Sequence, residues 1–121
     1  MIYERSNEFL KDLKRLRKKF PTLPDDLENL RKFNIELFHD GTNTGSIIPI
    51  EGLCGELYTS YKVRKIACRA LKNKGSNTGL RLIYVHERKA NKITFLEIYF
   101  KGEKENENKE RIKSFIKTLL I

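Results

Sequence analysis

The chain has 121 residues, 39% of them hydrophobic and 34% charged, and 25 basic against 16 acidic residues give it a net charge of +9. This length predicts one domain, residues 1–121, with a single core, and the charge favours a polyphosphate or an acidic protein as partner. No apolar run approaches the ~20 residues of a membrane span and the N-terminus has no signal-peptide pattern, so we expect a cytoplasmic protein.

The cysteines and histidines do not form a metal or disulfide framework in the sequence. Cys54 and Cys68 make no C-x-x-C motif and predict reduced thiols, with Cys68 a small core residue. His39 and His86 are 47 positions apart and lack carboxylate-rich neighbours, so we predict no metal and no other cofactor. His86 is interpreted as a surface strand residue, with a role as acid or base as the alternative.

Residues 1–20 predict an edge strand followed at once by a helix. The apolar pair Ile2 and Tyr3 begins the strand, and Ser6 or Asn7 can cap the helix. Apolar residues at helical spacing define the buried stripe of this helix, and basic residues occupy its other face. The stripe consists of Phe9, Leu10, Leu13, Leu16 and Phe20.

A second helix is predicted from the capping signature of Thr22 and Asp25 to about His39, where Asp40-Gly41 closes it. Its expected buried face is formed by Leu23, Leu27, Leu30 and Leu37, with Phe33 or Phe38 alongside. Two amphipathic helices joined by a short connection predict an antiparallel hairpin that covers a sheet. Residues 41–55 are rich in turn-forming residues and are interpreted as a connecting loop anchored by Ile47 to Ile50.

Residues 61–104 are the most strand-like part of the chain and predict three successive strands, with turns at 73–79 and 89–91. In the first strand the apolar parity changes near Arg64 and Lys65, which a β-bulge would reconcile. The second, from Leu80, is apolar on both faces and therefore central. In the third, Leu96, Ile98 and Phe100 are expected on one face, and Phe95 and Tyr99 on the other.

Asn106 or Asn108 is expected to cap a last helix, whose apolar stripe is Ile112, Phe115, Ile116, Leu119 and Leu120. Helices followed by strands predict an α+β protein with an antiparallel sheet.

Between Tyr61 and Arg81 the chain carries seven basic residues and no acidic one: Lys62, Arg64, Lys65, Arg69, Lys72, Lys74 and Arg81. With the bulge in place, Lys62, Arg64 or Lys65, and Arg69 would project from one face of the sheet. Such a cluster is typical of a surface that faces a polyanion. The alternative is that these residues are solvated and serve only solubility.

The order of motifs resembles the RelE/ParE superfamily of bacterial and archaeal toxins, and within it the RelE-like and HigB-like branch. The specific part runs from Y-K-V-R-K through G-L-R-L-I-Y to L-E-I-Y-F-K-G-E-K-E-N, between Tyr61 and Asn106. The resemblance implies a RelE-like α+β fold, in which an N-terminal strand and a helical hairpin pack on a twisted antiparallel sheet with a C-terminal helix.

The resemblance also implies an activity and partners. RelE-like toxins of type II toxin-antitoxin systems enter the ribosomal A site and cut mRNA, and a cognate antitoxin holds them inactive. The ribose 2′-hydroxyl attacks the adjacent phosphate without a metal and leaves a cyclic phosphate. We expect this chain to be such an endoribonuclease, with no cofactor, and its antitoxin to be acidic or to carry an amphipathic segment.

By the same resemblance, Lys62 and Arg64 match basic positions that line the toxin's cleft, and Arg81 matches the arginine at the scissile phosphate. Tyr99, Lys101 and Lys104 fall in the segment that holds the later active-site residues. We expect Lys62 to act as base or electrostatic stabiliser, Lys101 or Lys104 as acid, Arg81 and Arg64 as phosphate clamps, and Tyr99 as a stacking surface for a displaced base. Further RNA contacts are expected from Lys65, Arg69, Lys72 and Lys74.

Structural roles are the alternative for several of these residues. Arg81 could pair with Glu97 across the sheet, Tyr99 could be a packed strand aromatic, and Lys104 could be half of a surface ion pair. Two other functions stay open as well. One is a ParE-like, non-enzymatic inhibitor of DNA gyrase, and the other is a non-catalytic RNA-binding module.

Overall fold

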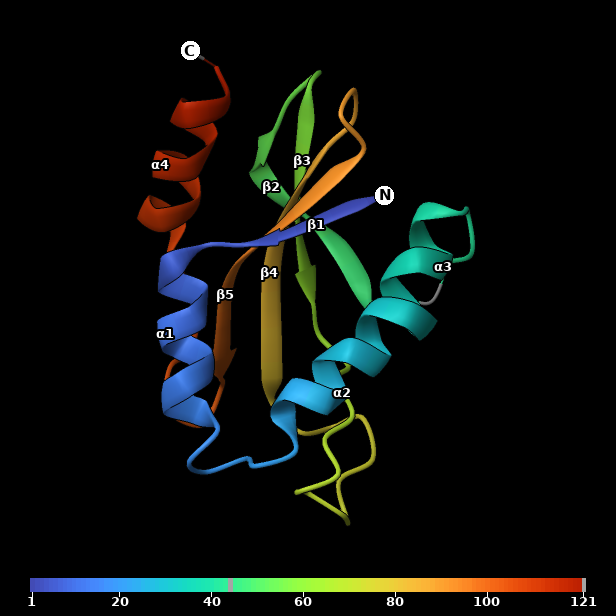
Figure 1. Cartoon of the computed structure of the whole chain (residues 1–121), viewed down its shortest axis with the longest axis vertical. Coiled ribbons are helices and arrows are strands. Elements are labelled where there is room, and N and C mark those ends of the chain that lie inside the picture. The colour runs from blue at the N-terminus through green and yellow to red at the C-terminus, as the bar shows by residue number, and fades with distance from the viewer. Residues whose placement is uncertain (44, 121) are drawn as a thin grey trace.

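The computed structural model describes residues 1–43 and 45–120, which form helices on both faces of one β-sheet (Figure 1). Within these residues the sheet has five strands in the order β1-β5-β4-β3-β2. The strands are β1 (Ile2–Arg5), β2 (Ile47–Cys54), β3 (Tyr58–Val63), β4 (Leu80–Glu87) and β5 (Lys92–Phe100). The helices are α1 (Asn7–Leu16), α2 (Leu23–Leu30), the π-helical turn η1 (Arg31–Ile35), α3 (Glu36–His39) and α4 (Lys109–Leu119).

The α+β class, the N-terminal edge strand and the central position of β4 are confirmed. The sheet, however, is mixed, because β1 pairs with β5 in parallel while the other neighbouring strands are antiparallel. The whole helical layer and three strands separate β1 from β5 in the sequence. No short hairpin therefore forces the two strands into antiparallel pairing.

The expectation of a loop over residues 41–55 was wrong, because this segment contains β2. The side chains of Ile47, Ile50 and Leu53 are buried, but they recur every three residues rather than every two. The register shifts between Pro49 and Cys54, and Gly52 has a φ of +82°. A proline and a bulge are typical of an edge strand, and here they hide the alternation that identifies a strand in sequence.

The expected bulge at Arg64 and Lys65 was also wrong, because β3 ends at Val63. The change of parity marks the end of the strand. Residues 64–79 continue without a further strand of their own, apart from an isolated bridge between Ile66 and Asn77. The hydroxyl of Thr78 donates to the carbonyl of Ile66 at 2.6 Å and helps to close this excursion.

β5 carries a bulge that the sequence did not predict. The register shifts between Ile83 and Tyr84, so that Ile83 lies opposite Glu97 and Tyr84 lies opposite Phe95. Leu96 is the extra residue and packs on the side of the sheet away from Ile98, with which we had grouped it. The bulge places Glu97 on the same face as Leu96.

The helix caps were predicted in part. Ser6 caps α1, since the backbone N–H of Phe9 donates to its hydroxyl, and Asn108 caps α4. Thr22 does not cap α2 with its side chain; its hydroxyl instead donates to Asp26 at 2.7 Å. Gly41, with a φ of +103°, follows the end of α3 as expected.

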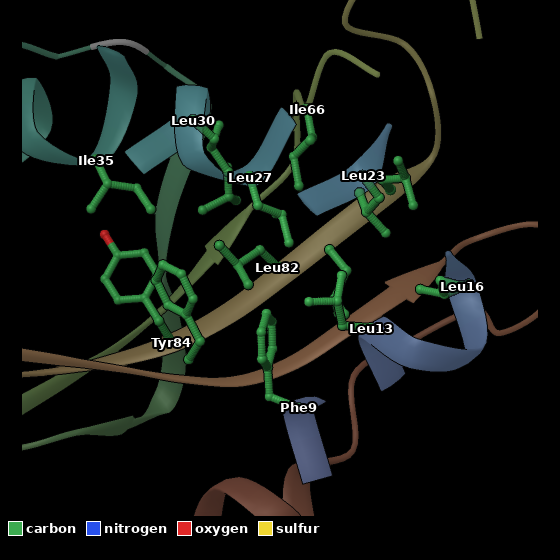
Figure 2. Packing of buried hydrophobic residues seen from close by; sticks show 14 of the residues in the cluster. Phe9, Leu13, Leu16, Leu23, Leu27, Leu30, Ile35, Ile66, Leu82 and Tyr84 are labelled. Atoms are coloured by element: carbon green, nitrogen blue, oxygen red, sulfur yellow. The ribbon is translucent and has the colours of Figure 1, made fainter. Parts of the chain in front are cut away.

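The helices divide the core into two clusters on opposite faces of the sheet. One face packs against α1, α2 and the π-helical turn, and Figure 2 shows the leucines of α1 and α2 meeting Leu82 and Tyr84 of β4. On the other face, Ile112 and Ile116 of α4 pack against Ile83, Val85 and Leu96. Three residues expected in apolar stripes, Leu10, Leu37 and Leu120, are instead exposed. The axes of α1 and α2 diverge from the turn that joins them, so the two helices do not lie antiparallel side by side (Figure 1).

An aromatic and histidine cluster closes the helical face near the end of α3. The Nε2 atom of His39 lies 2.8 Å from the Tyr84 hydroxyl, and the ring centres of His39 and His86 are 4.4 Å apart. Burial first, and then the charge of His86, lower the pKa of His39 to about 4, while Asp40 acts in the opposite direction. Cys68 is buried as expected, and both cysteines are free.

This cluster predicts that stability depends on pH. The folded state binds fewer protons than the unfolded state between the unfolded pKa of ~6.5 and the folded value, so stability falls as pH falls through that range. We expect the wild type to lose about 1–2 kcal/mol more than a His39→Gln variant between about pH 7 and pH 5, allowing for partial solvent screening. Urea unfolding at both pH values measures the difference, and equal losses in the two proteins would contradict it.

Candidate functional site

Polar side chains gather on the face of the sheet that α4 partly covers. Lys62 of β3 lies opposite Ile83, which in turn lies opposite Glu97, and Arg81 lies opposite Tyr99. Because side chains alternate along a strand, Lys62, Glu97, Arg81 and Tyr99 occupy adjacent rows of the same face. Sequence reasoning placed Lys62, Arg81 and Tyr99 near one another, and the structure brings them together.

The segment between β5 and α4 crosses over this face and adds two charged residues. The Lys62 ammonium lies 2.7 Å from Oε2 of Glu107, and the Tyr99 hydroxyl donates to the same oxygen at 3.4 Å. Lys104 forms an ion pair with Oε2 of Glu97, and its ammonium is 5.6 Å from the centre of the Tyr99 ring. The turn that starts the segment contains Gly102, where a Cβ atom would lie 2.6 Å from the Phe100 ring and would displace it.

Glu97 of β5 binds the segment that joins β5 to α4. Its side chain is 3% exposed, and its Oε1 atom accepts the backbone N–H of Asn108 at 2.8 Å. Asn108 is the cap of α4, so the same carboxylate fixes both Lys104 and the start of the helix. A buried carboxylate is stable only with such partners.

The site combines a deprotonated carboxylate with a protonated phenol. Burial acts to raise the pKa of Glu107, but the hydrogen bond and charge of Lys62 outweigh it and leave the pKa below its ordinary value. Burial, followed by the charges of Glu107 and Glu97, raises the pKa of Tyr99 well above its ordinary value, and Arg81 opposes that rise only in part. At neutral pH, Glu107 is therefore an acceptor and Tyr99 a donor.

Arg81 connects this cluster to a neighbouring hollow of about 360 Å³, lined by Arg64, Lys65, Ser76, Asn77, Gly79 and Arg81. One nitrogen of its guanidinium donates to the carbonyls of Arg64 and Leu80 at 2.9 and 3.0 Å. Arg81 does not pair with Glu97, whose partner is Lys104. Arg64 and Lys65 are exposed, so three cationic side chains surround this hollow.

Other predicted site residues lie elsewhere. Arg69 pairs with Asp25 and Asp26 of α2 at 3.4 and 3.3 Å, and its backbone N–H also bonds Asp26. The expectation that Arg69 shares a face with Lys62 was therefore wrong, because the chain leaves the sheet after Val63 and folds against α2. Lys72 and Lys74 are exposed in the loop that follows.

At the end of β5, the structure buries Tyr99 and exposes Lys101. Tyr99 is only 2% exposed, so its ring is a packed strand aromatic and cannot serve as a platform for a displaced base. Lys101 is exposed at the turn after β5, where its backbone N–H bonds the carbonyl of Gly79. Sequence reasoning missed Glu107 altogether. The acid-rich tract G-E-K-E-N-E-N was the available signal, but it lies outside the basic stretch.

No family model and no curated protein matches the chain. Among solved structures, it is similar to the crystal structure of the archaeal RelE-RelB complex from Pyrococcus horikoshii OT3, with a TM-score of 0.52 over 84% of this chain and 94% of that chain. The chain has the RelE-like fold. Sequence identity between the two RelE-like chains is 16%, so the likeness establishes the fold and transfers no residue roles.

Among the residues that the structure describes, no helix of this RelE-like chain is long and apolar enough to cross a membrane. In the same residues, no group of three or more histidine, cysteine, aspartate or glutamate side chains is arranged to hold a metal ion.

Proposed function

We propose that this protein is the toxin of a type II toxin-antitoxin pair and that it cleaves mRNA on the ribosome by metal-free attack of the ribose 2′-hydroxyl. The observation that carries the proposal is the convergence of Lys62, Arg81 and Lys104 around Tyr99 on one face of a RelE-like sheet. The similarity to the RelE chain of a RelE-RelB complex supports the fold on which it rests.

The chemistry needs positive charge where the phosphate passes through its transition state. Arg81 is the phosphate clamp, with Arg64 beside it across the shared hollow. Lys62 is an electrostatic stabiliser, because an ammonium that donates to Glu107 has no lone pair with which to accept a proton. Lys104 or Lys101 supplies a proton to the leaving oxygen.

The outer cations fit a supporting role in RNA binding. Lys65 lines the hollow beside Arg81, and Lys72 and Lys74 are exposed on the loop that leads to β4. Arg69 stays available only in part, since its ion pairs with α2 compete with a phosphate. Contacts of this kind strengthen binding without sequence preference and make it depend on salt.

An antitoxin partner follows from the same proposal. The solved RelE neighbour is bound to RelB. This chain has a net charge of +9, which favours an antitoxin with an acidic or amphipathic segment. Toxin and antitoxin would meet in the cytoplasm.

Induced expression tests the proposal against its two alternatives. A ribosome-dependent endoribonuclease stops protein synthesis before DNA synthesis, and this is the result we expect from pulse labelling after induction. Arrest of DNA synthesis first would instead support a ParE-like inhibitor of gyrase. RNA binding that weakens with salt while the mRNA stays intact would support a non-catalytic module.

A further inference from the structure

Glu107 is an unexpected group at the centre of a cationic site. Its side chain is 6% exposed, and it lies within reach of both Lys62 and Tyr99. Among the described residues, the cluster holds three cations, Lys62, Arg81 and Lys104, against the two carboxylates of Glu97 and Glu107. A site that served only to grip a phosphate would gain nothing from a carboxylate in its middle.

We infer that Glu107 is the general base that accepts the proton of the attacking 2′-hydroxyl, with Lys62 and Tyr99 orienting its carboxylate. This inference rests on the proposed endoribonuclease function, and it assigns the general base that the proposed function left unassigned. Both side-chain contacts of Glu107 end on Oε2. Lys62 and Tyr99 therefore fix the carboxylate through one of its two oxygens.

The protonation states agree with this assignment. A free lysine has a pKa of ~10.4 and is almost wholly protonated at neutral pH, which makes it a poor base. Glu107 has a lowered pKa and is deprotonated under the same conditions. Tyr99 has a raised pKa and remains a donor, so it holds the carboxylate without competing for the proton.

The reaction balances with groups that this chain supplies. Glu107 takes the proton from the 2′-hydroxyl as the 2′-oxygen forms its bond to phosphorus. The bond from phosphorus to the 5′-oxygen breaks, and that oxygen takes a proton from a lysine ammonium, Lys104 or Lys101. The products are a 2′,3′-cyclic phosphate and a 5′-hydroxyl, and neither an oxidant nor a metal takes part.

Glu97 is the positioning residue behind Glu107. It accepts the backbone N–H of Asn108, the residue directly after Glu107, and pairs with Lys104 on its other oxygen. Nearly full burial and two fixed partners restrict the segment that carries the base to one path across the sheet.

A Glu107→Gln variant tests the inference in single-turnover cleavage of mRNA on programmed ribosomes. Glutamine keeps the shape and can still accept from Lys62 and Tyr99, but it cannot take a proton. We expect the cleavage rate to fall by roughly 10²- to 10⁴-fold, the usual contribution of general base catalysis. Glu105→Gln is the matched control, because Glu105 is an exposed carboxylate of the same tract, and it should cleave at the wild-type rate.

The pH dependence of the wild type gives a second readout that does not depend on how well the variant folds. With Glu107 as base, the rate should stay nearly flat from about pH 6 to about pH 8.5, because the carboxylate is already deprotonated. A lysine base would instead raise the rate about tenfold per pH unit over this range.

Three results would overturn the inference. Cleavage by Glu107→Gln at the wild-type rate would show that the carboxylate takes no proton. Faster cleavage by this variant would show that Glu107 blocks the phosphate site instead of serving it. A wild-type cleavage rate that rises steadily with pH would show that a lysine, and not Glu107, is the general base. If the wild type leaves mRNA intact on the ribosome, the proposed function itself fails, and the inference fails with it.

Discussion

Replacing Arg81 by alanine is expected to reduce mRNA cleavage on programmed ribosomes by roughly 10²- to 10³-fold, as loss of one preorganised transition-state contact does in other enzymes. The guanidinium lies opposite Tyr99 and lines the hollow that Arg64 and Lys65 share. Its two carbonyl contacts engage a single nitrogen, so most of its donors remain free for a phosphate.

The same variant should keep a thermal transition close to that of the wild type. The Arg81 bond to the Arg64 carbonyl is exposed, and water can replace the donor there at a cost of about 1 kcal/mol or less. Lys89→Ala removes one exposed positive charge at the far end of β4 and serves as the control. If Arg81→Ala cleaves mRNA at the wild-type rate, or if both variants lose the same fraction of that rate, Arg81 is not part of the site.

Replacing Phe9 by alanine is expected to lower the free energy of unfolding by about 3–5 kcal/mol, the usual cost of truncating a fully buried aromatic. Phe9 is 0% exposed, and its ring centre lies 5.5 Å from that of Phe95. Figure 2 shows it between α1 and the sheet, next to Leu13 and Tyr84. The loss is a large share of the ~5–15 kcal/mol that holds a domain of this size together.

The adjacent residue provides the control for this measurement. Leu10 is 43% exposed, so Leu10→Ala should cost less than about 1 kcal/mol in the same urea titration. Similar losses in the two variants would mean that α1 does not pack on the sheet through Phe9.

The family resemblance was enough to predict part of the site, because it placed Lys62, Arg81 and Tyr99 together. Alternation along β5 instead put Tyr99 on the face of Phe95, and the bulge at Leu96 separates the two. Alternation along β3 also stopped applying where that strand ends. Arg69 was misplaced because β3 stops at Val63 and because its partner Asp26 lies 43 residues away in the sequence.

Glu107 and β2 were missed for a different physical reason. β2 carries Pro49 and a positive-φ Gly52, so its buried residues do not alternate. Glu107 follows β5 in a polar tract that resembles a solvated loop, and only the crossing of that tract over Lys62 buries its carboxylate. Which of several acids will meet a given lysine depends on tertiary packing, and local patterns carry no information about it.

The chemical ends of the cleaved mRNA test the central claim most directly. mRNA fragments should be recovered from programmed ribosomes after treatment with the wild-type protein, and the groups at each new end determined. Attack by the 2′-hydroxyl predicts an upstream fragment that ends in a 2′,3′-cyclic phosphate and a downstream fragment that begins with a 5′-hydroxyl. Intact mRNA, or fragments that begin with a 5′-phosphate, would contradict the account.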